Sequence, residues 1–270
     1  MTSRWSKIIL TLGYSLLYVP LLCIVVYSFN GSRFVGTWTS FSFRWYEHLF
    51  HNDIILRAAI TSAKIASITA TAAVVLGTMA AIIITRFRKF KGKSLFMGLI
   101  AAPLIMPDAV IGISFLMLFI AMKKLIGIPS GDGIYTVCIA HIVLTLSYVT
   151  MTIQARLYNI DKSIEEAALD LGASPIKVFF VITLPMIMPS IIYSWLLAFA
   201  LSLDDVVIAS FVAGPGATTL PMVIFSSLRF GISPEINALA TILILCLSIG
   251  VVVTSIMMYR KNLNKKIRKN

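Results

Sequence analysis

Six long apolar stretches decide what this 270-residue chain can fold into. They run roughly over residues 8–29, 65–85, 95–121, 135–155, 186–203 and 234–259. A helix needs about 20 consecutive apolar residues to cross the hydrocarbon core of a bilayer. Only 13% of the residues are charged, about half of the share that a water-facing domain carries. The sequence therefore predicts an all-α, polytopic membrane protein with six transmembrane helices, in which residues 1–270 form a single transmembrane domain.

Two places depart from this simple pattern of spans. Pro103 and Pro107 interrupt the third apolar stretch, because proline lacks the backbone N–H that a helix needs. A seventh apolar stretch, over residues 206–212, is too short to cross a bilayer and runs into Gly-Pro-Gly, which is typical of a turn. We predict a re-entrant or surface segment there.

The basic residues predict the orientation of the spans. Lysine and arginine are retained on the cytoplasmic side of an inner membrane. With the N-terminus inside, 16 of the 23 basic residues fall in cytoplasmic segments, six of them after residue 259. Both termini are therefore predicted to be cytoplasmic. The net charge of +12 follows from this asymmetry and needs no nucleic-acid partner. The basic C-terminal tail is suited to contact anionic lipid headgroups.

The sequence offers little that would support an enzyme. The three cysteines lie singly inside apolar stretches, which fits neither a disulfide framework nor a metal site. Gly92-Lys93-Ser94 resembles the end of a phosphate-binding loop, but Phe87 stands where that loop needs its first glycine. No HExxH or GxSxG motif is present. We expect no catalytic residues, no metal, no nucleotide site and no cofactor in this chain.

The segment between the fourth and fifth apolar stretches predicts a helix, a break at glycine and a second helix. Ser163 and Glu166 have the spacing of a capping box at the start of the first helix. Gly172 is the residue type favoured just past a helix end. Ser174 and Pro175 are favoured at the start of the second helix, which would end at the Leu-Pro pair ahead of the fifth stretch. Such a segment either docks into a soluble partner or forms a simple loop with interfacial helices.

The same segment carries a long motif. The pattern Glu166-Ala167-Ala168-x3-Gly172-x9-Ile182-x-Leu184-Pro185 resembles, at every defined position, the EAA loop of ABC importer permeases of the binding-protein-dependent transport family. Outside that loop, Met106-Pro107-Asp108, Leu203-Asp204-Asp205 and residues 233–241 are similar to the polyamine permeases, above all those of bacterial putrescine importers.

This resemblance implies a type I ABC importer permease fold in the bacterial inner membrane. It implies a heterodimer with a homologous second permease, two cytoplasmic ATPase subunits that bind ATP and Mg, and a periplasmic polyamine-binding protein. The chain would move polyamines, putrescine first of all, into the cytoplasm by alternating access. The coupling segment 156–185 would meet the ATPase through Glu165, Glu166, Ala167, Ala168, Gly172, Leu184 and Pro185.

A substrate pathway for a polyamine needs carboxylates for the ammonium groups and aromatic faces for cation–π contact. Acidic residues in or at the end of a span are costly and usually functional. The candidate pathway residues are Asp108, Asp204, Asp205, Tyr193, Trp195 and Glu235. Each has a structural alternative: Asp205 pairing with a basic group of the partner permease, Glu235 favouring a helix N-terminus, and the aromatic residues packing. His141, a lone histidine in the fourth stretch, is interpreted as a hydrogen-bonded packing residue.

Two other readings of the whole chain stay open at this point. The first is a permease of the same importer type for spermidine or another solute, whose EAA loop would look the same. The second is an ion-coupled secondary transporter, in which intramembrane acids carry protons. Such a transporter commonly shows internal repeats, and the two halves of this chain show no convincing similarity.

Overall fold

The computed structural model describes residues 4–33, 37–87, 90–128, 133–230 and 234–245 and the single positions 248, 249 and 252. Nearly all of them are helical, and the described part contains a single isolated β-bridge, between Asn30 and Phe41. The chain divides into two compact units, Met1–Leu56 with Ser226–Asn270, and Arg57–Phe225.

The first unit contains α1 (Arg4–Tyr27), α2 (Arg44–His51) and the helix Pro234–Leu245. The loop between α1 and α2 is organised around Asn30. Its side-chain amide donates to the carbonyl of Thr37 at 2.7 Å and accepts from the backbone N–H of Thr39 at 3.1 Å. The indole of Trp45 donates to the Asn30 carbonyl at 2.6 Å. The aromatic segment that follows the first span is thus a folded element.

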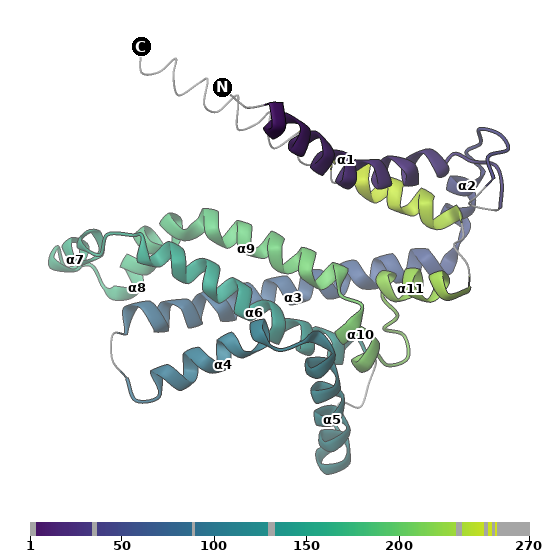
Figure 1. The fold of residues 1–270 in the computed structure, drawn as a ribbon. Coiled ribbons are helices and arrows are strands. Elements are labelled where there is room, and N and C mark those ends of the chain that lie inside the picture. Colours follow the sequence, from purple (N-terminus) through teal and green to yellow (C-terminus); the bar gives the residue numbers. More distant parts are fainter. Residues whose placement is uncertain are drawn as a thin grey trace. The chain divides into compact units, whose positions relative to one another are not determined.

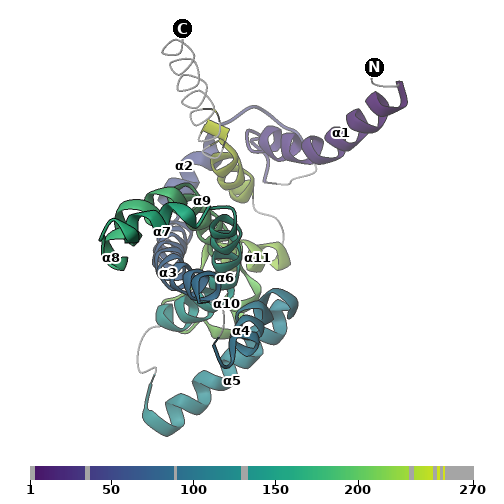
Figure 2. The same ribbon diagram turned by 90° about the vertical axis from the view of Figure 1, so that its left-hand side faces the viewer.

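The second unit is built around four helices that lie side by side in Figure 1, with Figure 2 viewing them from one end. They are α3 (Asp53–Arg86), α4 (Lys93–Ile105), α6 (Ile134–Tyr158) and α9 (Leu184–Asp204). One buried core joins α3, α6 and α9 and consists of Ala70, Ala73, Val74, Ala81, Val149, Ile153, Leu157, Ile160, Ile187 and Ala198. The small residues on α3 let the helices approach closely. Close contact matters in a membrane because lipid is as apolar as the side chains, so the hydrophobic effect does not drive helices together there.

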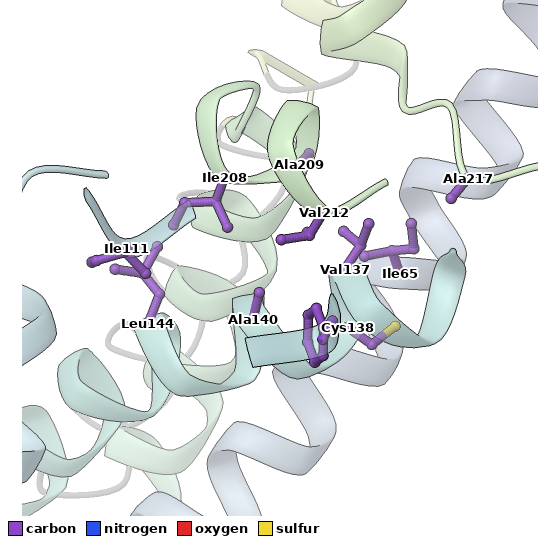
Figure 3. Close-up of a cluster of buried hydrophobic side chains, with 11 residues drawn as sticks. Ile65, Ile111, Val137, Cys138, Ala140, Leu144, Ile208, Ala209, Val212 and Ala217 are labelled. Carbon is purple, nitrogen blue, oxygen red and sulfur yellow. The ribbon is translucent and has the colours of Figure 1, made fainter. Parts of the chain in front are cut away.

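A second core joins α5 (Asp108–Ile126), α6 and α10 (Val207–Val212). Figure 3 shows Ile208 and Val212 of α10 pointing toward residues of α5 and α6. Both side chains are buried, as is Ala209. One face of the short segment after the fifth stretch therefore packs against α5 and α6, while Val207 and Ser210 are exposed, and the re-entrant or surface placement of the segment stays a prediction.

A glycine sets how closely α5 and α10 pack. A Cβ built on Gly112 would lie 2.6 Å from Cδ2 of Phe211, whereas one built on Gly98 of α4 meets nothing within 4 Å. We expect Gly112→Ala to lower the free energy of unfolding by about 1–3 kcal/mol, the usual cost of overpacking. Gly98→Ala is the matched control and should be neutral or slightly stabilising, because alanine has the higher helix propensity. Thermal unfolding in detergent measures both, and equal stability of the two variants would contradict this packing.

The helices confirm the predicted spans in part. Five helices of the described residues are long and apolar enough to cross a membrane: Arg4–Tyr27, Asp53–Arg86, Asp108–Ile126, Ile134–Tyr158 and Pro175–Asp204. The sixth predicted stretch is described only as far as the helix Pro234–Leu245, so its remainder and the basic tail lie outside the described residues.

The third predicted span, residues 95–121, is not one helix. It splits into α4 and α5 at Met106 and Pro107, whose ψ angles of 140° and 138° are extended. The cause is Pro107, which lacks an N–H and disfavours helical backbone in the residue before it. Asp108 consequently lies at the first residue of α5, and the interruption predicted at Pro107 is confirmed. Pro103 lies within α4 and does not end it.

Candidate coupling segment and substrate pathway

The first helix of the candidate coupling segment is α7 (Ser163–Asp170). The predicted capping box is wrong, since the N-cap position is Lys162 and no side chain caps from there. Instead Oδ1 of Asp161 accepts a hydrogen bond from the backbone N–H of Ser163 at 3.0 Å. Hydrogen bonds from Ser163 hold the pKa of the Asp161 carboxyl below its ordinary value. Asp161, two residues before Ser163, therefore accepts the N–H that the side chain of Glu166 would accept in a capping box.

The predicted break at Gly172 is confirmed. Gly172 has a φ of +84°, a left-handed conformation that glycine adopts without steric cost. Its N–H bonds to the carbonyl of Leu169 at 2.9 Å, and the N–H of Ala173 bonds to that of Ala168 at 3.1 Å. These two bonds form a Schellman motif, which satisfies the carbonyls at the end of α7.

The second helix begins as predicted but does not end where we expected. Ser174 caps α8 (Pro175–Val178), with Pro175 in its first turn. A five-residue π-turn, η1 (Phe179–Thr183), then leads straight into α9. The helix passes the Leu-Pro pair because Pro185 falls in the first turn of α9, next to the π-turn. π-Turns inside helices are found often at functional sites.

The candidate coupling residues do not all face the same way. Glu166, Ala167, Gly172 and Pro185 are exposed, whereas Glu165, Ala168 and Leu184 are partly buried. The carboxylate of Glu165 accepts from Nη2 of Arg86 at 2.5 Å and from Oγ1 of Thr183 at 2.7 Å. Neither Arg86 nor Thr183 was a sequence-based candidate. Arg86 stood out only as one positive charge of a basic cluster, and no local pattern pointed to Thr183.

Two candidate pathway acids are exposed at helix ends. Asp108 opens α5 directly after the extended Met106-Pro107 pair, and Asp204 is the last residue of α9. Within the part of the chain that the structure describes, neither carboxylate makes a hydrogen bond or an ion pair. Both carboxylates are thus free to meet a ligand or a partner chain.

Asp205 differs from Asp204, because its side chain is only 8% exposed and forms several hydrogen bonds within this chain. Its carboxylate accepts from Nε2 of His141 at 3.1 Å and from the backbone N–H groups of Ile208 at 3.3 Å and Ala209 at 2.8 Å. Nδ1 of His141 lies 2.8 Å from Oγ of Ser202. Asp205 therefore caps α10 and ties it to α6, and its basic partner is a histidine of this same chain. The interpretation of His141 as a hydrogen-bonded packing residue is confirmed.

The two candidate aromatic residues lie on different sides of α9. Tyr193 is 59% exposed. The indole of Trp195 donates to Oγ1 of Thr71 on α3 at 3.1 Å, and its ring stacks on Phe199 with centroids 5.3 Å apart. Residues two apart on a helix do not face each other, so Tyr193 and Trp195 do not form one aromatic site within this chain.

Glu235 belongs to the first unit and stands at the start of the helix Pro234–Leu245. Its Oε2 accepts from the side-chain amide of Asn52 at 3.0 Å. A carboxylate in the first turn also favours a helix N-terminus. Both observations suit the structural alternative for this residue.

Five helices long and apolar enough to cross a membrane, joined in part by a glycine-broken segment ahead of α9, place the described part of the chain in the class of multi-pass membrane proteins. The protein belongs to the family described as "binding-protein-dependent transport system inner membrane component", whose profile matches residues 73–269. It is a multi-pass inner-membrane protein and a transport component.

Individual relatives cover most of the chain. It is 54% identical over 242 residues to the putrescine transport system permease protein PotI of Escherichia coli K12, covering 90% of this chain and 86% of that protein. It is 43% identical over 249 residues to the spermidine/putrescine transport system permease protein PotC of Haemophilus influenzae, covering 92% and 94%.

Solved structures share the fold. A bacterial ABC transporter involved in the import of the acidic polysaccharide alginate matches with a TM-score of 0.67 at 14% identity, over 96% of this chain and 98% of that one. An amino acid ABC transporter matches with a TM-score of 0.54 at 16% identity, over 78% and 95%. The type I importer fold expected from the resemblance is thus supported by structure as well as by sequence.

Proposed function

We propose that this chain is the permease subunit of an ATP-driven importer that moves polyamines, with putrescine as the preferred substrate, from the periplasm to the cytoplasm. The similarity to PotI supports the substrate class. The main structural support for a cationic substrate is the pair of exposed carboxylates, Asp108 and Asp204. Each lies at the end of a helix and has no partner in the described part of the chain. Ammonium groups of a polyamine suit such carboxylates.

In this proposal the chain pairs with a homologous second permease, two cytoplasmic ATPase subunits and a periplasmic polyamine-binding protein. ATP and Mg are bound by the ATPase subunits. Six spans place both termini in the cytoplasm, together with the coupling segment 156–185. Docking of the exposed face of α7 into the ATPase, through Glu166, Ala167 and Gly172, passes the ATPase movement to the spans.

The substrate is tested by uptake of labelled putrescine into cells with and without the gene, with unlabelled spermidine as competitor. Loss of saturable putrescine uptake on deletion, with weak competition by spermidine, is the expected result. Strong competition would favour the second candidate, a spermidine permease, to which the 43% identity to PotC lends support. Unchanged uptake would remove polyamines from the proposal.

Removing the charge of Asp108 or Asp204 is expected to reduce putrescine uptake. Asp108→Asn and Asp204→Asn keep the side-chain shape but remove the charge, so each should lower putrescine uptake by about tenfold, as expected when one hydrogen bond to a charged group is lost. Glu47→Gln serves as the control, because Glu47 is an exposed acid of α2 outside the proposed pathway. Normal uptake in both aspartate variants, at equal amounts of protein in the membrane, would return these acids to a structural role.

A further inference from the structure

Glu165 connects three elements that are far apart in sequence. Its Oε1 is bonded to Nη2 of Arg86 and to Oγ1 of Thr183. Arg86 is the last residue of α3, and Thr183 is the last residue of the π-turn η1. A single carboxylate oxygen of α7 therefore holds the end of α3 and the start of α9 at one point, which we name the polar junction (Arg86, Glu165 and Thr183).

The polar junction is poorly suited to a purely stabilising role. The Arg86 and Glu165 side chains are only 18% and 14% exposed, and burying an ion pair usually adds little net stability because both charges lose their water. In addition, Nη1 of Arg86 is buried without a hydrogen-bond partner among the described residues, which is a cost. Because the polar junction adds little stability and links α7 to α3 and α9, its role is better explained by the transmission of movement between these helices.

Of the helices that meet at the polar junction, α9 leads to a candidate pathway acid at its far end. α9 runs from the polar junction to Asp204, and its 21 residues form a rod about 30 Å long at 1.5 Å per residue. α3 is longer, with 34 residues. Figure 1 shows α7 and α8 at one end of α9 and α10 at the other. A displacement of α7 at the polar junction is thus carried along α9 toward Asp204, a candidate pathway acid.

We propose that Arg86 and Thr183 are positioning residues that act through Glu165, so that the polar junction makes α3, α7 and α9 move as one body when an ATPase subunit moves α7. The inference rests on the proposed importer function and refines its coupling step. It assigns Glu165 to the interior of the permease. The exposed Glu166, one residue further along α7, then faces the ATPase.

The test measures transport and ATP hydrolysis together, in the importer purified with its partner subunits and reconstituted in lipid vesicles. Glu165→Arg places two positive charges against each other, and we expect the maximal rate of putrescine uptake to fall by about tenfold, within the range of a coupling between two sites. The KM for putrescine and the ATP hydrolysis measured without the binding protein should stay within about twofold. The stimulation of ATP hydrolysis by the loaded binding protein should fall together with uptake, because coupling between two sites is reciprocal. Thr183→Val removes one donor and should have a smaller effect in the same direction.

Two further variants separate positioning from folding. The exchange R86E/E165R restores the opposite charges and should recover most of the uptake that each single change loses. Glu47→Gln removes an exposed acid of α2, outside the coupling segment, and should leave uptake unchanged.

Three outcomes overturn an assignment. A parallel fall of uptake, of the ATP hydrolysis measured without the binding protein and of the amount of assembled complex, without rescue by the exchange, would overturn the positioning role. Normal uptake in Glu165→Arg would overturn it as well. No putrescine uptake by the unmodified importer would overturn the proposed function itself, a result distinct from either.

Discussion

Replacing Gly172 by aspartate is expected to abolish uptake while the protein remains folded in the membrane. The backbone there has a φ of +84°, and no atom of the described residues lies within 4 Å of an added Cβ, so the new Cβ displaces none of them. It projects instead from the exposed end of α7, where we propose that the ATPase docks. The carboxylate also lies at a helix C-terminus, which carries partial negative charge and repels anions.

The matched control for this prediction is Gly172→Asn. Asparagine has nearly the shape of aspartate and tolerates the left-handed conformation comparably, but it is neutral. We expect reduced uptake with Asn and none with Asp, measured with labelled putrescine at equal membrane levels of both proteins. Uptake at the normal rate in Gly172→Asp would exclude the coupling role of this glycine.

The largest expected loss of stability comes from His141→Leu. His141 is 1% exposed and Asp205 8% at the side chain, and leucine fills a similar volume but cannot donate to the carboxylate. The buried charge of Asp205 then keeps only its two backbone donors, from Ile208 and Ala209. We expect a cost of about 3 kcal/mol, because a charged group loses a hydrogen bond in a buried setting. Thermal unfolding in detergent is the measurement.

Two companion variants show whether the missing donor is the cause. His141→Gln retains an N–H that can reach a carboxylate, and it should be much less destabilising than the leucine variant. Combining His141→Leu with Asp205→Asn removes the buried charge as well and should recover part of the loss. If the glutamine and leucine variants unfold at the same temperature, the hydrogen bond between His141 and Asp205 contributes nothing and only the packing of the ring matters.

Errors in the sequence-based expectations have local physical causes. Ser163 and Glu166 have the residue types and spacing of a capping box, but Asp161 accepts the backbone N–H of Ser163 that the Glu166 side chain would accept in such a box. Pro185 was expected to end a helix, but the π-turn η1 places it in a first turn that tolerates proline. Pro103 was expected to interrupt the third apolar stretch together with Pro107, but it lies within α4, and the break falls at Pro107. In each case several local signals compete, and hydropathy or spacing alone does not rank them.

The sequence by itself determined the properties that depend on chain composition and on neighbours along the chain. Long apolar runs require helices in a membrane, because there every backbone polar group must be satisfied within its own segment. The left-handed turn after α7 requires a glycine such as Gly172, and the EAA pattern around it indicated the transport family that the comparisons confirm.

The tertiary structure alone decided which polar side chains meet. Arg86 and Glu165 are 79 residues apart, and His141 and Asp205 are 64 apart. Whether a helical side chain faces a neighbouring helix or the outside depends on how the helices rotate and pack, which no local pattern encodes. For that reason Glu165 and Glu166, which are identical residues adjacent in sequence, have different surroundings. Glu165 is partly buried and bonded to Arg86 in the polar junction, whereas Glu166 is exposed.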